Sequence, residues 1–216
     1  MRLRSLIWAL AALGVTGCDD AGRGLGGLCA ARDATGEGIR TLALLDGAVR
    51  ARGPEGYCID QGASDARRGF AILAGCALMA PDAAVMPSLD GLITVQFGQE
   101  GTASVTGNEE GFAAFLRSDA GRGLLSRTGD LATVPDVVTV TDASAVLARF
   151  EDAGGAGIPN TGGQQWRGFL DIGGRLVTVT VLSFDRNPLS AVEGERLLVV
   201  TMAELAEINA VPDVSG

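Results

Sequence analysis

The residues of this chain that could carry chemistry are carboxylates, thiols and arginines, because its 216 residues include no histidine and every basic residue is an arginine. Histidine is the usual general base near neutral pH and the commonest metal ligand. Catalytic triads, lysine Schiff bases and histidine-ligated metal sites are therefore excluded within the chain. No stretch has the alternating Asp/Asn spacing of a calcium loop. The sequence predicts no metal and no cofactor, and it disfavours an enzyme.

One set of candidates for the remaining chemistry consists of carboxylates. Asp171 with Asp185 or Glu151 would form an acid–base pair if burial or a like charge raised one pKa. The pair would form if the turn after the hairpin that holds Asp171 folded back toward it. Nothing in the sequence indicates such burial, so an exposed aspartate at the end of a hairpin is the favoured interpretation.

The other candidates are arginines and a tryptophan. Arg67 and Arg68, together with Arg175, would grip an anionic ligand through paired hydrogen bonds. Solvated loop charges are the alternative, and the favoured one. Trp166 is predicted to lie in the core, and if it faced outward it would anchor an interface.

Cys18 ends a segment with the marks of an export signal. Arg2 and Arg4 precede an uncharged apolar run from Leu6 to Val15, which is too short to span a membrane. The closing Val15-Thr16-Gly17-Cys18 resembles the lipobox of bacterial lipoproteins. That resemblance implies cleavage after Gly17 and diacylglyceryl transfer to the Cys18 thiol. An ordinary secretory signal with a chance cysteine is the alternative.

This interpretation divides the chain into a signal peptide (1–17), a glycine-rich flexible tether (18–38) and one domain (39–216). The domain would face the periplasm from a lipid anchor. Asp19 resembles the inner-membrane retention signal of enteric bacteria, and the choice between inner and outer membrane stays open.

The net charge limits the partners. It is −9 for the whole chain and becomes −11 once Arg2 and Arg4 are removed with the leader. Such a protein is repelled by phosphates, which argues against nucleic acid and against electrostatic docking on anionic lipid. Membrane attachment would then depend on the acyl chains, and other envelope proteins remain as possible partners.

The three remaining cysteines, Cys29, Cys58 and Cys76, allow three choices of a single disulfide in an oxidising compartment. We favour Cys58–Cys76, because both lie in apolar segments typical of strands whereas Cys29 lies in the glycine-rich region.

The elements that must position these residues are clearest between Trp166 and Leu182. Gly173-Gly174 between two strand-like runs predicts a two-residue hairpin. Alternation then divides the side chains between two faces. The apolar face would hold Trp166, Leu170, Ile172, Val177, Val179 and Val181, and the mostly polar face Arg167, Phe169, Asp171, Thr178 and Thr180.

Further strands are predicted over 41–52 as a hairpin, and over 57–60, 70–79, 92–97 and 137–140. Three helices are predicted from capping residues and apolar spacing. The first begins after Asn108 and buries Phe112, Phe115 and Leu116. The second runs from Thr141 or Asp142 to Glu151, with Val146, Leu147 and Phe150 facing inward. The third begins after Ser190 and ends at about Asn209.

This order predicts an α+β fold, a mostly antiparallel sheet with packed helices in a sandwich. The element order over residues 55–210 resembles that of PsbP-like envelope domains, without a diagnostic motif. We expect a lipid-anchored, non-catalytic domain that binds or scaffolds envelope components. The alternatives are a module that binds a small ligand between sheet and helices, and a carboxylate-dependent enzyme.

Overall fold

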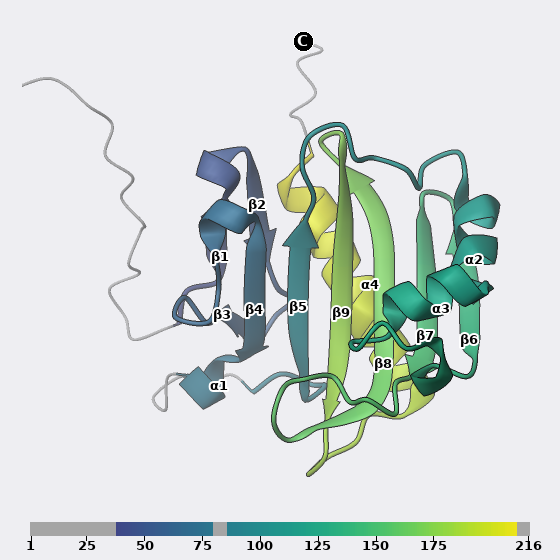
Figure 1. Ribbon diagram of the computed structural model, residues 1–216. Coiled ribbons are helices and arrows are strands. Elements are labelled where there is room, and N and C mark those ends of the chain that lie inside the picture. The colour runs from purple at the N-terminus through teal and green to yellow at the C-terminus, as the bar shows by residue number, and fades with distance from the viewer. Residues whose placement is uncertain (1–37, 80–85, 211–216) are drawn as a thin grey trace, which may run out of the picture. The chain divides into compact units, whose positions relative to one another are not determined.

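The computed structural model describes residues 38–79 and 86–210, which form an α+β fold (Figure 1). Its centre is a seven-stranded sheet in the order β3-β4-β5-β9-β8-β7-β6, and every neighbouring pair is antiparallel. The predicted mostly antiparallel sheet with packed helices is therefore confirmed. The predicted signal peptide, Cys18 and Cys29 lie outside the described residues.

Sixteen elements follow one another along the described residues. They are β1 (Thr41–Leu44), η1 (Leu45–Gly47), β2 (Val49–Arg52), β3 (Tyr57–Ile59), η2 (Ala66–Arg68), β4 (Phe70–Gly75), α1 (Cys76–Met79), β5 (Gly91–Phe97), α2 (Glu109–Arg117), α3 (Asp119–Leu125), η3 (Leu131–Thr133), β6 (Val137–Asp142), β7 (Ala145–Glu151), β8 (Thr161–Ile172), β9 (Arg175–Phe184) and α4 (Ala191–Ile208).

The β8–β9 hairpin has the register that its two-glycine turn predicts. Ile172 pairs with Arg175 and Trp166 with Val181, and Gly173 and Gly174 both adopt positive φ, as a tight turn of this type requires. Trp166 is only 1% exposed and its indole N–H donates to the Ala191 carbonyl. The alternative role of Trp166 as an outward-facing interface anchor is therefore wrong.

The predicted helix that ends at Glu151 is also wrong, because residues 145–151 form strand β7. Residues 143 and 144 turn the chain between β6 and β7, and β7 then pairs with β6 on one side and β8 on the other. The segment is rich in helix-forming residues, but two ladders of hydrogen bonds and burial on both faces outweigh local propensity.

Two smaller predictions need correction, and one helix was missed. The strand expected over 70–79 ends at Gly75, and Cys76 begins the short helix α1. Helix α3 was not predicted; Ser118 caps it by accepting a hydrogen bond from Gly121 N–H. In α2 the buried side chains are Ala113 and Leu116, whereas Phe115 is 42% exposed.

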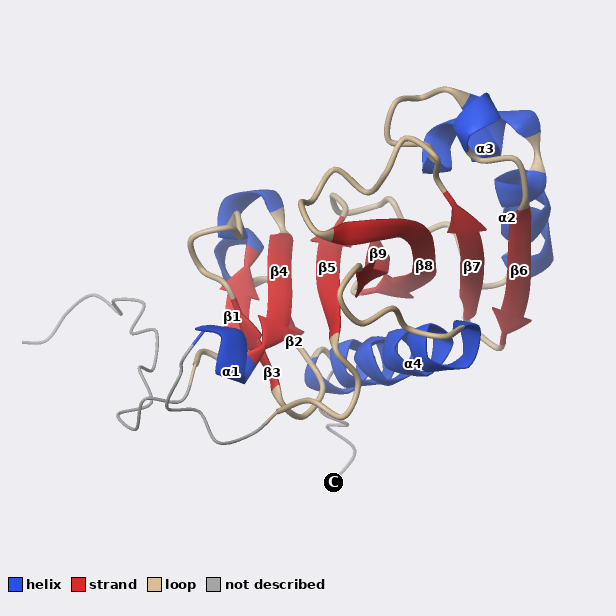
Figure 2. Cartoon of the chain, turned by 90° about the horizontal axis from the view of Figure 1, so that it is seen from below, coloured by secondary structure: helices blue, strands red, loops and turns tan. Residues whose placement is uncertain are grey.

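The two faces of the sheet are covered unequally (Figure 2). Helix α4 and the β1–β2 hairpin pack against one face and bury its apolar side chains, including Val95, Val179 and Trp166. The capping box expected at Ser190 and Glu193 begins α4. On the opposite face α2 and α3 cover the β6–β7 end, where Val146, Ala148 and Phe150 are buried.

Cys58 and Cys76, the pair that the sequence favours, lie at disulfide distance, with their Cα atoms 4.8 Å apart. Cys58 is in β3, at one edge of the sheet, and Cys76 begins α1 directly after the neighbouring strand β4. The bridge thus ties the short edge strand to the rest of the sheet. Among the described helices none is long and apolar enough to cross a membrane.

Candidate functional site

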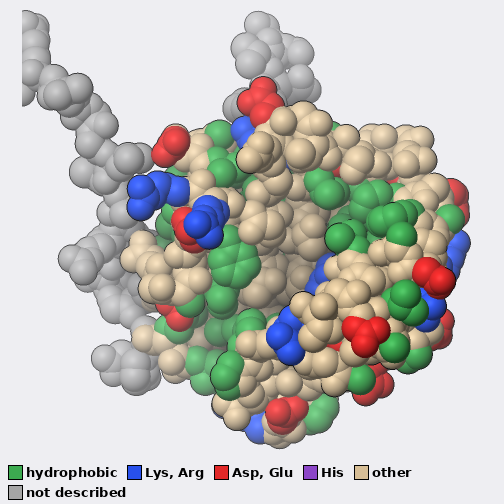
Figure 3. Space-filling model, viewed as in Figure 1, with side chains coloured by type: hydrophobic (Ala, Val, Ile, Leu, Met, Phe, Trp, Pro, Cys, Tyr) green, Lys and Arg blue, Asp and Glu red, His purple; other side chains and the backbone are tan. Residues whose placement is uncertain are grey.

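The uncovered half of the second sheet face, over β4, β5 and β9, is the candidate site. We call it the open face. Figure 3 shows that it is hollowed over β5 and β9, with hydrophobic side chains along the β4 side and arginine side chains at its border toward α3. Strand alternation and the observed register assign its side chains. They include Phe70, Ile72, Thr94, Gln96, Thr178 and Thr180, and the buried pair Leu92 and Leu182 continues the same face at one end.

One row of directly paired residues crosses this face from β4 to β8. Ile72 pairs with Thr94, Thr94 with Thr180, and Thr180 with Arg167. Side chains paired in this way lie about 5 Å apart at their Cβ atoms. The row therefore changes from apolar at β4, through two hydroxyls, to a positive charge at β8.

The hydroxyls of the open face are not used by the fold. Within the described part of the chain, the side chains of Thr94, Thr178 and Thr180 make no hydrogen bond, whereas Gln96 donates to the carbonyls of Arg68 and Phe97. Each threonine keeps a donor and an acceptor for another molecule or for water.

Arg167 is the least expected residue of this region. Its Nε is buried and has no hydrogen-bond partner among residues 38–79 and 86–210, and no carboxylate in these ranges lies within ion-pair distance of it. Burial lowers the pKa of Arg167 to about 10, and the charge of Asp152 acts in the opposite direction. The guanidinium still carries its positive charge at neutral pH.

Two neighbours hold this charge in place without neutralising it. Nη2 of Arg167 donates to Gln165 Oε1 at 3.1 Å, and the guanidinium carbon lies 5.2 Å from the centre of the Phe150 ring. A cation over an aromatic face is stabilised by the ring's quadrupole. The charge is therefore fixed in position at the border of the hollow.

Asp152, the acidic residue whose charge acts on Arg167, is engaged elsewhere. Its buried carboxylate accepts hydrogen bonds from the backbone N–H groups of Arg127 and Gly154. Burial opposes its ionisation, but these hydrogen bonds, with one from the Thr133 side chain and the charge of Arg127, hold the pKa of Asp152 below its usual value. Asp152 thus fixes two loops together rather than pairing directly with Arg167.

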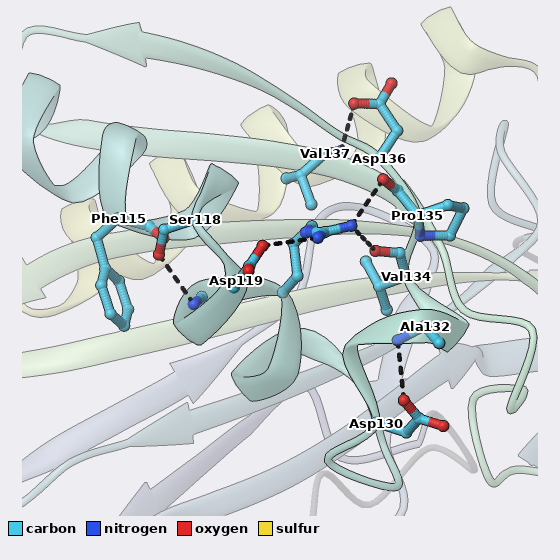
Figure 4. A network of polar contacts seen from close by, with 11 residues as sticks. Phe115, Ser118, Asp119, Asp130, Ala132, Val134, Pro135, Asp136 and Val137 are labelled. Atoms are coloured by element: carbon cyan, nitrogen blue, oxygen red, sulfur yellow. Dashed lines mark hydrogen bonds and ion pairs between the residues drawn. The ribbon is translucent and has the colours of Figure 1, made fainter.

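The α3 side of the hollow is fastened by a polar network (Figure 4). Arg122 donates to the carbonyls of Val134 and Pro135 and pairs with Asp119 at 2.8 Å. These contacts join α3 to the segment that leads into β6. They fix α3 at the β6–β7 end of the sheet, where Leu125 of α3 packs with Val137 and Val146.

The arginines singled out from the sequence do not form a joint site. The Arg68 side chain is 86% exposed and pairs with Asp65 at 3.6 Å in η2, and Arg67 beside it is exposed. Arg175 donates to the Gly98 carbonyl and pairs with Glu100. The exposed Arg67 and Arg68 agree with the interpretation of solvated loop charges, whereas Arg175 begins β9 and its side chain is only 13% exposed.

The carboxylates do not meet either. Asp171 pairs with Leu176, and Asp185 follows nine positions later, just past the end of β9, roughly 30 Å away at 3.3 Å per residue. Glu151 lies beside Gln164, near the other end of β8 from Asp171. The alternative of a carboxylate pair, which required the turn after the hairpin to approach Asp171, is wrong, because the long antiparallel hairpin places its two ends apart.

Asp171 has a structural role. Its carboxylate accepts hydrogen bonds from the backbone N–H groups of Ser104, Val105 and Thr106. Partial burial opposes ionisation, but these bonds outweigh it and lower the pKa of Asp171. The aspartate thereby positions the segment that leads into α2.

No group of three or more acidic or cysteine side chains in the described residues is arranged to hold a metal ion. No protein-family model matches the chain, and no curated protein matches it significantly. The resemblances to lipoproteins and to PsbP-like domains therefore remain predictions.

The sequence placed Arg167, Thr178 and Thr180 on one polar face but did not single out Arg167. The one signal in the sequence that could have identified Arg167 is its place on a strand face that also carries the apolar Phe169. What the sequence lacked was the identity of the neighbours that bury the guanidinium.

Proposed function

We propose that this chain is a lipid-anchored protein of the bacterial envelope whose domain binds a small molecule on the open face. The observation that carries the binding role is the hollow over β5 and β9, lined by the half-buried Thr94 and Thr178 and the more deeply buried Thr180, whose hydroxyls make no hydrogen bond within the described residues (Figure 3). Ligand sites are commonly concave, with apolar walls and a few polar groups that fix orientation. The lipid anchor is supported by the sequence pattern that ends at Cys18.

Binding is tested by thermal shift against a library of small metabolites, since a ligand that binds the folded state raises the melting temperature. In Thr94→Trp the hollow is filled by an indole, and stabilisation by any hit should disappear. Val138→Trp is the matched control, because Val138 is 45% exposed on β6, away from the open face. A hit that stabilises both variants equally contradicts the proposed place of binding.

The anchor is tested by intact-mass measurement of the chain purified from membranes. We expect a start at Cys18 with added acyl mass, its loss in Cys18→Ser, and its retention in Cys29→Ser. An unprocessed leader, or a processed chain without acyl mass, refutes the anchor without affecting the binding role.

A protein partner is the second candidate, favoured by the edge strand β6. Val138 and Val140 are 45% and 49% exposed, and β6 ends the sheet, so one row of its backbone groups is unpaired within the described sheet. Such edges accept an added strand. A photo-crosslinker at position 138 should capture an envelope protein, and one at Val192, 75% exposed on α4, should not capture the same protein.

A further inference from the structure

The guanidinium of Arg167 is a half-buried charge with a fully buried Nε, and no carboxylate of the described residues pairs with it directly. Removing a charge from water is costly unless hydrogen bonds and an opposite charge compensate it. In the described residues Arg167 has one hydrogen bond, to Gln165, and an aromatic ring beneath it. The buried and unpartnered Nε shows that this compensation is incomplete.

The free edge of the guanidinium is suited to a planar anion. Nη2 uses one N–H for Gln165, and Nη1 donates to no described residue. The terminal edge formed by Nη1 and Nη2 therefore keeps parallel N–H groups, which match the two oxygens of a carboxylate. Tetrahedral dianions such as phosphate usually gather several cations or a row of backbone N–H groups. The row that crosses the open face supplies only this one arginine.

The rest of the row specifies the remainder of the ligand. Thr180 and Thr94 follow Arg167 across the sheet, and Ile72 ends the row beside Phe70 on β4. Strands lie about 4.8 Å apart, so the distance from β8 to β4 is roughly 14 Å. A molecule lying along the row would meet a positive charge first, then hydroxyls, then an apolar surface.

From this juxtaposition we infer that the open face binds a small organic carboxylate, with its carboxylate on Arg167 and its apolar end toward Ile72. The inference rests on the proposed binding role of the open face and adds the chemical class and orientation of the ligand. Hydrogen bonds from Thr180 and Thr94 would fix polar groups next to the carboxylate. The apolar end would displace water from the β4 side of the hollow.

The test follows the Arg167 Nε–H resonance by NMR in the full-length chain, purified in detergent. Burial of this N–H should slow its exchange with water, and Arg167→Gln identifies the signal by removing it. The probes are acetate, butyrate and hexanoate, with hexanamide and inorganic phosphate as comparisons. We expect the carboxylates to shift the signal, with affinity rising up to about fourfold for each methylene that is buried.

Variants assign the two ends of the site. Because Arg167→Gln lacks the NMR signal, its binding of hexanoate is measured by calorimetry, beside the unmodified chain. It should be at least tenfold weaker, the loss expected for a charge-assisted hydrogen bond. Thr180→Val keeps a branched side chain of the same shape and should weaken hexanoate binding several-fold. This variant tests the site even if Arg167→Gln fails to fold. Arg149→Gln is the matched control, because Arg149 pairs with Trp166 and so lies on the opposite face; its affinity should not change.

The assignment to carboxylates is overturned if hexanamide binds as tightly as hexanoate. It is also overturned if phosphate at equal concentration competes with hexanoate. An unmoved Arg167 signal with every carboxylate overturns the inference as a whole. If the metabolite screen still finds a ligand that Thr94→Trp abolishes, the proposed function survives that result. If neither experiment detects binding at the open face, both fail.

Discussion

The contact between α4 and the sheet is close enough that one methyl group should disrupt it. Gly194 lies in the first turns of α4 directly over the Trp166 ring. A Cβ at position 194 would overlap three ring carbons, and the farthest of them, Cζ2, would be 2.5 Å away. Carbon atoms in contact are ordinarily about 3.5–4.0 Å apart. Gly194→Ala therefore requires the helix or the indole to move by about 1 Å.

Neither partner is free to move. The indole N–H donates to the Ala191 carbonyl at 3.1 Å, and the capping box fixes the start of α4. Overpacking a core costs roughly 1–3 kcal/mol, and the higher end applies where both sides are held. Alanine gains about 1 kcal/mol over glycine in a helix. The net loss should be about 2 kcal/mol, which lowers the melting temperature by roughly 4–8 °C in a domain of this size.

The assay is thermal unfolding followed by circular dichroism, with urea unfolding as a second measure. Gly123→Ala in α3 is the matched control, because the nearest atom to its new Cβ would be the Gly129 carbonyl oxygen at an ordinary 3.6 Å. Gly123→Ala should stabilise the protein slightly, through helix propensity alone. A melting temperature for Gly194→Ala equal to or above that of the unmodified chain would refute the packing of α4 on Trp166.

Three further perturbations have defined outcomes. Asp171→Asn should destabilise the protein at neutral pH. The folded-state pKa of Asp171 is lowered, so its ionisation contributes stability. That contribution is complete above the unfolded pKa of about 3.9 and is lost as the pH falls through the folded pKa. Urea midpoints measured from pH 7 down to pH 3 should therefore converge for the two proteins, and a constant difference would exclude the carboxylate charge as the cause. The double variant Cys58→Ser, Cys76→Ser removes a bridge between residues 18 apart. It should lower the free energy of unfolding by about 3 kcal/mol, measured in urea under oxidising conditions. An unchanged midpoint would mean that the bridge contributes nothing. Ser190→Ala removes the acceptor for Glu193 N–H and should cost about 1 kcal/mol, and a wild-type melting temperature would show that the cap of α4 is dispensable.

Local patterns were sufficient wherever turn chemistry and side-chain periodicity agreed. Gly173-Gly174 and the alternation on either side of it predict the β8–β9 register, and Ser190 with Glu193 predicts the start of α4. These signals are short-range, because a turn type fixes the register of its own hairpin and a capping box satisfies its own backbone groups. The fold class followed from the number of such hairpins and late helices.

The segment from 145 to 151 shows where local patterns fail. Its alanine, leucine and arginine residues favour a helix, yet it pairs with β6 and β8 in the middle of three strands. Pairing with a strand that begins ten residues later along the chain is not visible in the segment itself. The candidate site depends on the same long-range pairing, because β7 supplies the Phe150 ring beneath Arg167.

By itself the sequence determined what chemistry is missing, the hairpin that carries Arg167, and the side of that hairpin on which Arg167, Thr178 and Thr180 lie. The tertiary structure alone decided that α2 and α3 cover only the β6–β7 end of the sheet and leave the open face exposed. It also decided that the Nε of Arg167 is buried and that no carboxylate in the described part of the chain pairs with this guanidinium directly. The physical reason is that periodicity assigns a side chain to a face, whereas the packing of distant elements determines whether that face is covered and which charges are paired.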